Sequence, residues 1–299
     1  MRVIAPGKLL LTGAYAVLEG APAMVVAVDR YAIADDVRGA SPPAREVRVA
    51  FGDGQAPSVD ASGLYLEGHK LGLGSSAAVL VSSLGLREAR RGADLASPDT
   101  RRLIFDTARK AHAQVQGGGS GVDIAASVYG GLLRYTLNQG HGEVTPLGFP
   151  EELSLAVFWT GASARTSELR GRVDALRVRD PAIYRARMGA LVQAAHGGAD
   201  AMVKADAEAF VPAARATYDA LAALGLAAEV AIVSAPMKEL TEHARAEDGA
   251  FFPSGAGGGD VAVFVGMGPV SQAFLSHAHR LGFRPVPVGM DMVGVRVSA

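Results

Sequence analysis

Three short glycine-rich segments carry residue types that could hold and transfer an anionic group. The first, GLGSSAA at residues 72–78, follows Lys70 and leads into an apolar run. A helix that begins at Ser75 and Ser76 would leave its first backbone N–H groups unpaired, with the positive end of its dipole there. Glycines just before such a helix let an anion approach the backbone, and the two hydroxyls could bind phosphate oxygens or a magnesium ion. Because the Gly-Lys-Ser/Thr of a P-loop is missing, a serine-capped helix after a tight turn is the alternative interpretation.

The other two segments end on aspartates. GGGSGVD at residues 117–123 places Asp123 near the start of a helix. A carboxylate beside flexible glycines can act as a base or a metal ligand, although N-capping is the better explanation of a lone aspartate. SGAGGGD at residues 254–260 runs directly into an apolar strand. It could pack closely against a ligand or another backbone, or simply connect a hairpin. Each segment alone is weakly specific, and the three together are much more so.

The elements that must position these segments predict an α+β fold in two lobes. The composition becomes helix-rich after a boundary near 145–152, which predicts domains at residues 1–150 and 151–299. An alternation of apolar and polar residues predicts a half-exposed strand at 45–51. Hydrophobic periodicity and capping signals predict further strands at 3–4, 9–11, 23–28, 131–136, 153–160, 261–265 and 284–296, and helices at 75–91, 97–116, 124–128, 165–177, 181–202, 205–224, 236–245 and 270–281.

Composition excludes several classes of protein. The chain has 299 residues with 29 Lys+Arg against 30 Asp+Glu, which argues against a broad nucleic-acid-binding surface. It has no cysteine, so disulfides, thiolate metal sites and cysteine nucleophiles are excluded. The N-terminal sequence does not have the pattern of a signal peptide, and no apolar stretch approaches the ~20 residues of a membrane span. We therefore expect a soluble cytoplasmic protein without nucleic-acid or membrane partners.

The glycine segments, in this order and together with APGKLLLTGAYAVLEG at residues 5–20, resemble the three motifs of the GHMP kinase superfamily. KLGLGSSAA at 70–78 matches the second motif and SGAGGGD at 254–260 the third. The resemblance spans essentially the whole chain. It implies an N-terminal domain like domain 2 of ribosomal protein S5, a ferredoxin-like C-terminal domain, and ATP bound with Mg²⁺ between them. The 72–78 segment would then be the loop that holds the ATP phosphates.

Local residues resemble the phosphomevalonate kinase branch of this superfamily. Gly13-Ala14-Tyr15 is closer to its Gly-x-Tyr than to the Gly-Glu-His of mevalonate kinases, and His112 stands where mevalonate kinases have a magnesium-binding glutamate. The resemblance implies 5-phosphomevalonate as acceptor and a monomer or homodimer. The alternatives are mevalonate kinase, another small-molecule GHMP kinase, diphosphomevalonate decarboxylase, or a non-catalytic ligand-binding homologue.

The resemblance also implies roles for individual residues. Lys8 would neutralise the transferring group and pair with Asp123, and both would be catalytic. Ser75 and Ser76 would also contact Mg²⁺. Arg165 would meet the acceptor phosphate, although it also fits an exposed arginine at a helix start. The implied ATP-binding residues are Lys70, Gly72, Leu73, Gly74, Ser75, Ser76 and Ala77; the implied acceptor-binding residues are Lys8, Tyr15, His112, Gln116, Ser120, Gly121, Arg165, Ser254, Gly255, Ala256 and Gly257.

Overall fold

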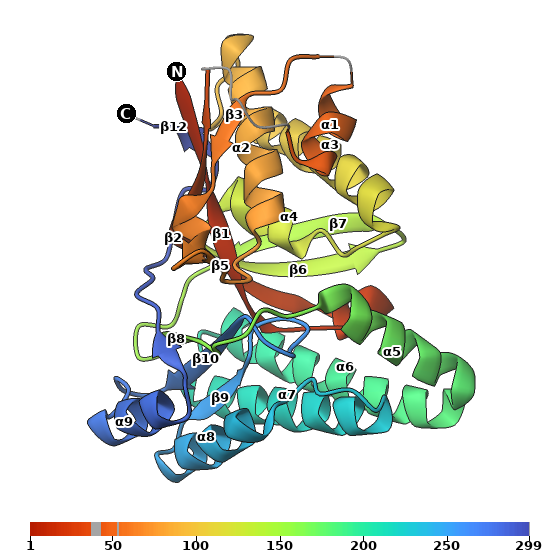
Figure 1. Cartoon of the computed structure of the whole chain (residues 1–299), viewed down its shortest axis with the longest axis vertical. Coiled ribbons are helices and arrows are strands. Elements are labelled where there is room, and N and C mark those ends of the chain that lie inside the picture. The colour runs from red at the N-terminus through yellow and green to blue at the C-terminus, as the bar shows by residue number, and fades with distance from the viewer. Residues whose placement is uncertain (37–42, 53, 299) are drawn as a thin grey trace.

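The first of two antiparallel sheets contains the N-terminal strand and has the order β12-β1-β2-β6-β7, with β3 also paired to β2. The computed structural model describes residues 1–36, 43–52 and 54–298, apart from the side chain of Gln116. Helices gather on one face of this sheet (Figure 1). The strands are β1 (Arg2–Thr12), β2 (Ala23–Asp35), β3 (Ser58–Asp60), β6 (Leu132–Asn138), β7 (His141–Leu147) and β12 (Arg296–Val297); the helices are α1 (Arg45–Phe51), α2 (Ser75–Arg90), α3 (Pro98–Gln116) and α4 (Val122–Tyr129).

Both faces of the two central strands are buried. Successive strand residues point to opposite faces, so Leu10 of β1 packs in a core with Leu80 of α2, whereas Leu9 packs in a second core with Phe252. This explains why β1 and β2 are apolar almost throughout instead of alternating. Two 3-10 helices, Ala16–Glu19 and Ser62–Leu64, and the hairpin β4 (Tyr65–Leu66) and β5 (His69–Lys70) complete this region.

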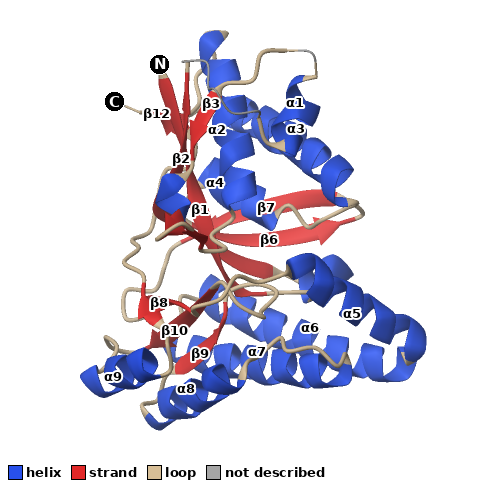
Figure 2. Cartoon of the chain, in the orientation of Figure 1, coloured by secondary structure: helices blue, strands red, loops and turns tan. Residues whose placement is uncertain are grey.

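The second sheet has the order β11-β8-β10-β9, again antiparallel. Figure 2 shows α8 and α9 on the side away from the first sheet, whereas α6 also packs against β1 and β2. Helices α7 and α8 pack on β9, and α9 packs on β11. The strands are β8 (Ser154–Trp159), β9 (Ala250–Pro253), β10 (Val261–Gly266) and β11 (Arg284–Pro285); the helices are α5 (Thr166–Arg179), α6 (Pro181–Val203), α7 (Ala207–Ala227), α8 (Ala235–Ala246) and α9 (Gln272–Arg280).

These two sheets with their helices confirm the predicted α+β class. The helices expected in the second half of the chain are present, with ends shifted by a few residues. No helix in the described ranges is both long and apolar enough to cross a membrane.

Three sequence predictions differ from the structure. Residues 45–51 form helix α1 rather than a strand, because Val47, Ala50 and Phe51 face the core at helical spacing. The two short strands predicted at 3–4 and 9–11 are one continuous strand, β1. The strand predicted at 284–296 is only β11 and β12, separated by an irregular segment that contains Pro287 and Gly294.

A bulge in β1 directs the backbone around Lys8. The register between β1 and β2 shifts between Pro6 and Gly7. Pro6 has no N–H to give to the sheet, and the N–H of Lys8 donates to the carbonyl oxygen of Leu73 at 2.9 Å. Bulges bend a strand and redirect its side chains. Here the bulge ties β1 to the loop that precedes α2.

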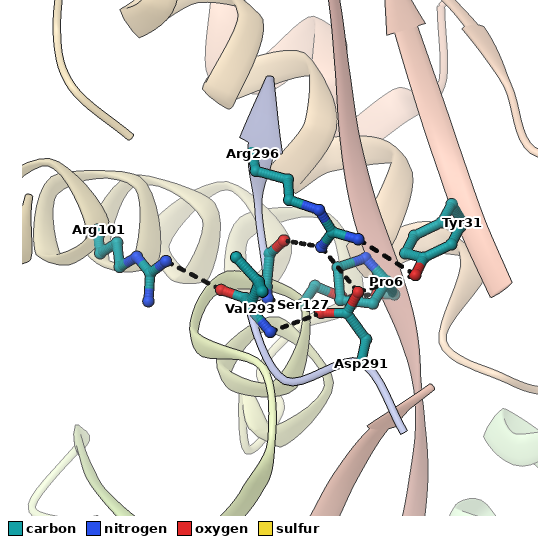
Figure 3. Close-up of polar contacts among 8 residues, drawn as sticks. Pro6, Tyr31, Arg101, Ser127, Asp291, Val293 and Arg296 are labelled. Atoms are coloured by element: carbon teal, nitrogen blue, oxygen red, sulfur yellow. Dashed lines mark hydrogen bonds and ion pairs between the residues drawn. The ribbon is translucent and has the colours of Figure 1, made fainter. Parts of the chain in front are cut away.

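The C-terminal segment crosses from the second sheet back to the first, where β12 pairs with β1 beside the N-terminus (Figure 1). The carboxylate of Asp291, 4% exposed, fastens this crossing. It accepts hydrogen bonds from the Tyr31 hydroxyl at 2.8 Å and from Arg296 Nη1 at 2.7 Å (Figure 3). The N–H groups of Val293 and Gly294 also donate to it. We call Tyr31, Asp291 and Arg296 the crossing cluster.

The chain passes from the first sheet to the second between β7 and β8, near residue 150. We propose the division into residues 1–150 and 151–299 on that basis. The division is not strict, because β12 belongs to the first sheet.

Candidate active site

A cavity of about 780 Å³ is lined by loops from both halves of the chain. One wall comes from β1, the 72–77 loop and the start of α4, and the other from the segments that follow β8 and β9. The predicted site residues that line it are Lys8, Tyr15, Lys70, Gly72, Gly74, Ser75, Ser76, Ala77, His112, Ser120, Gly121, Asp123, Arg165, Ser254, Gly255 and Ala256. Segments far apart in the sequence thus meet at one place, and their individual roles stay predictions.

Glycine is required in the 72–77 loop for two reasons. Gly72 and Gly74 both have φ of +74°, in the left-handed region. A Cβ on Gly72 would lie 2.3 Å from Asp260 Oδ2, and one on Gly74 would lie 3.0 Å from Lys8 Cγ. Gly74 is the N-cap of α2, and no side chain caps that end. The loop therefore presents helix N–H groups to the cavity, as an anion site requires.

Lys8 of β1 is buried beside this loop and faces Asp123. Lys8 is 7% exposed, and its Nζ lies 3.8 Å from Asp123 Oδ1 and 3.3 Å from the carbonyl oxygen of Gly72. The two residues are held in place because the Ser127 hydroxyl of α4 donates to the carbonyl oxygen of Pro6 at 2.7 Å (Figure 3). The pair can place a positive charge beside an anion bound at the loop.

A glutamate outside the motifs contacts one of the two predicted metal-binding serines. The Ser76 hydroxyl donates to Glu46 Oε1 at 2.8 Å, and Glu46, from α1, is 9% exposed. The described residues contain no group of three His, Cys, Asp or Glu side chains that could hold a metal. Two adjacent hydroxyls and Asp123 fit Mg²⁺, because that ion keeps water and substrate phosphates among its ligands.

The third glycine segment is fastened to the first motif. The N–H of Leu10 donates to the Ser254 hydroxyl at 2.9 Å, and the Tyr15 hydroxyl donates to the carbonyl oxygen of Ala256 at 2.8 Å. Burial raises the pKa of Tyr15 above its usual range, and the nearby Arg170 guanidinium opposes the rise. Tyr15 therefore stays a neutral donor at any physiological pH.

His112 stands near the second glycine segment with an unsatisfied nitrogen. Its Nδ1 is buried and has no hydrogen-bond partner within the described residues. The carbonyl oxygen of Ser120 accepts from the Tyr135 hydroxyl, which anchors that segment. Gln116 closes α3, but its side chain, with the predicted acceptor contact, lies outside the described residues.

Two predicted site residues do not line the cavity. Leu73 is fully buried in the core and contributes only its carbonyl oxygen, which holds Lys8. Gly257 packs against Ile232 instead, where a Cβ would lie 2.3 Å from the carbonyl oxygen of that residue. Residue type alone does not reveal which positions of a glycine-rich loop face inward.

Asp260 and Arg170 line the cavity but were not among the predicted residues. Desolvation raises the pKa of Asp260, although the Ala164 N–H, Lys8 and Lys70 act to lower it. Its Oδ1 accepts from that N–H at 3.0 Å and ties the loop after β8 to the third segment. Asp260 ends the quoted motif, so the signal for it was available. Arg170 and Glu46 stand in no motif, and only the fold brings them to the site.

Comparison with known proteins gives a consistent result, although no protein-family model matches the chain. The phosphomevalonate kinase of Streptomyces sp. (strain CL190) is 28% identical over 97% of each chain. A mevalonate kinase of Thermococcus gammatolerans is 36% identical over 38% of this chain and 31% of that enzyme.

Solved structures share the fold. The Lin0012 protein of Listeria innocua has a TM-score of 0.84 at 23% identity, over 99% of both chains. Streptococcus pneumoniae phosphomevalonate kinase, in complex with phosphomevalonate and AMPPNP, has a TM-score of 0.79 at 18% identity, over 97% of this chain and 99% of that chain. The chain is therefore homologous to phosphomevalonate kinase and to mevalonate kinases, and it has the GHMP kinase fold.

Proposed function

We propose that this chain is a mevalonate-pathway kinase that transfers the γ-phosphoryl group of ATP to the phosphate of 5-phosphomevalonate, releasing ADP. The observation that carries the proposal is the Lys8–Asp123 pair beside an uncapped helix N-terminus in one cavity. The near full-length homology to a phosphomevalonate kinase supports this acceptor. The partial matches to mevalonate kinases support the broader class.

Phosphoryl transfer depends mainly on positioning and charge stabilisation. In the proposed reaction, the 72–76 backbone and the hydroxyls of Ser75 and Ser76 hold the β- and γ-phosphates. Lys8 stabilises charge on the transferring group, and Asp123 keeps Lys8 in place. The acceptor oxygen belongs to a phosphate that is already ionised at neutral pH, so a strong general base is not needed. Mg²⁺, held by phosphate oxygens with Ser75 or Ser76, would supply further charge neutralisation.

A coupled assay of ADP release tests the proposal, with Mg-ATP and mevalonate, 5-phosphomevalonate or 5-diphosphomevalonate in parallel reactions. Turnover only with 5-phosphomevalonate is expected. Turnover with mevalonate instead would assign the chain to mevalonate kinases and discard the acceptor. Absence of ADP release with all three, while ATP still binds, would favour the non-catalytic alternative.

A further inference from the structure

The four cationic side chains that line the cavity differ in what balances their charge. Lys8 faces Asp123. Arg165 lies 3.7 Å from Glu168 and is 85% exposed, so its charge is paired and solvated. Lys70 lies close enough to Asp260 for its positive charge to act on the pKa of that carboxyl group. Arg170, by contrast, has neither a hydrogen bond nor an ion pair with any part of the chain that the structure describes.

Arg170 is held at the wall of the cavity that the segment after β8 forms, because it belongs to helix α5. Helix α5 begins near the middle of the molecule (Figure 1). Leu169 and Val173, four residues apart on the same face, are buried and fix the rotation of α5. Leu169 also packs beside Gly258, where a Cβ would lie 2.9 Å from its Cδ1. The half-buried Arg170 therefore stands beside the third glycine segment and Tyr15.

Charge balance indicates what Arg170 binds. A phosphomonoester carries about −1.5 to −2 charge at pH 7. In the proposed function, ATP at the 72–76 segment engages Lys8 and the N-terminus of α2. An acceptor that carries its own phosphate adds a second anion, whereas the corresponding alcohol adds none. A guanidinium offers a planar pair of donors that matches two phosphate oxygens, and it stays charged at all relevant pH values.

We propose that Arg170 binds the phosphate of the acceptor and sets the preference for a phosphorylated acceptor over an alcohol. This proposal rests on the proposed function and deepens it. It replaces Arg165, the cation expected from the sequence, with a residue five positions further along the chain. In this assignment Arg165 is an exposed residue at a helix start, paired with Glu168.

Steady-state kinetics of Arg170→Gln, Arg170→Lys and a matched control test the proposal. The control is Arg172→Gln, because Arg172 is an exposed residue of the same helix that does not line the cavity. We expect Arg170→Gln to raise the KM for 5-phosphomevalonate roughly 10- to 100-fold, the effect of losing a charge-assisted hydrogen bond. The KM for ATP should change less than about twofold, Arg170→Lys should be intermediate, and Arg172→Gln should match wild type.

Three outcomes would overturn the proposal. The first is an unchanged acceptor KM in Arg170→Gln together with a large rise in Arg165→Gln, which would restore Arg165 as the phosphate ligand. The second is an equal rise in the KM for ATP, which would make Arg170 a general cation of the cavity. If Arg170→Gln does not fold, Arg170→Lys still decides between these results. The third is a wild-type chain inactive on 5-phosphomevalonate, which would remove the proposed function and this inference with it.

Discussion

Polar side chains in the crossing cluster have hydrogen-bond and ion-pair partners within the chain, whereas several in the cavity lack them. In the cluster the carboxylate of Asp291 has four donors, from Tyr31, Arg296 and two backbone N–H groups. In the cavity Arg170 has no hydrogen bond or ion pair among the described residues, and the buried Nδ1 of His112 has no hydrogen-bond partner there. Both regions join the two halves of the chain, so the contrast does not follow from their place in the fold.

The two aspartates show the same contrast in their pKa values. Burial acts to raise the pKa of Asp291, but its hydrogen bonds outweigh burial and hold it below the usual range. In the cavity, desolvation dominates at Asp260 and raises its pKa. Buried polar groups that serve structure are satisfied within the chain. Groups left partly unsatisfied in a cavity are candidates for ligand contact.

The largest effect is expected from Asp123→Asn, which changes the cavity and should lower turnover without lowering stability. Because Asp123 positions Lys8, the variant should lose on the order of 10²- to 10³-fold in kcat. Its melting temperature should stay close to wild type, since the Asp123 side chain is 38% exposed. The measurements are the ADP-release assay and thermal unfolding.

Asp99→Asn is the matched control for that change. Asp99 also lies in the first turn of a helix, α3, but is exposed and does not line the cavity. It should retain full turnover. An Asp123→Asn enzyme that keeps its turnover within a few-fold of wild type would remove Asp123 from the reaction and support a binding protein instead.

Asp291→Asn changes the crossing cluster and should lower stability without changing the kinetics. Removal of one charge from a buried, hydrogen-bonded pair costs about 3 kcal/mol, which chemical denaturation would measure as a lower free energy of unfolding. The KM values of the folded enzyme should not change. Asp106→Asn, in an exposed ion pair with Arg102, should have little effect. Equal stability of Asp291→Asn and wild type would show that the cluster does not fasten the crossing.

The pH dependence of unfolding tests whether the lowered pKa of Asp291 contributes to stability. A carboxyl whose folded pKa is lowered contributes stability that is fully present above its unfolded pKa of about 3.9 and is lost as pH falls through the folded value. Wild type should therefore lose more stability than Asp291→Asn between pH 5 and pH 3. Parallel curves for the two proteins would show that Asp291 is not the group responsible.

The smallest effect is expected from Asp260→Asn. Its raised folded pKa means that the ionised form is penalised at neutral pH, and stability grows as pH falls through the window between the unfolded and folded values. An amide removes this penalty and can still accept from the Ala164 N–H. We expect a melting temperature about 1–3 °C higher at pH 7, with no gain at pH 4. A lower melting temperature at pH 7 would mean that the attraction to Lys8 and Lys70 outweighs desolvation.

Apart from α1, the helices could be predicted because capping signals and hydrophobic periodicity are local, and the three glycine segments can be seen directly in the sequence. The sequence could not distinguish α1 from a strand, since its apolar residues include 47, 49 and 51, at strand spacing, and 47, 50 and 51, at helical spacing. Nor could it show that the C-terminal segment returns to the first sheet, because β12 is only two residues long.

The site was predictable to the extent that it lies in motifs. Lys8, Ser75 and Asp123 follow from their motifs, and the fold brings them to one cavity. Arg170 and Glu46 depend on how α5 and α1 pack, which no local pattern encodes. Arg165 also lines the cavity, and its role stays a prediction. Its ion pair with Glu168 follows from their spacing of three residues.

The most direct test of the central claim is a competition between acceptors followed by phosphorus NMR. The enzyme receives limiting Mg-ATP with equal concentrations of mevalonate and 5-phosphomevalonate. The account predicts that the monoester signal declines as the paired signals of a diphosphate ester grow, while mevalonate is not consumed. Growth of the monoester signal, with mevalonate consumed first, would contradict it.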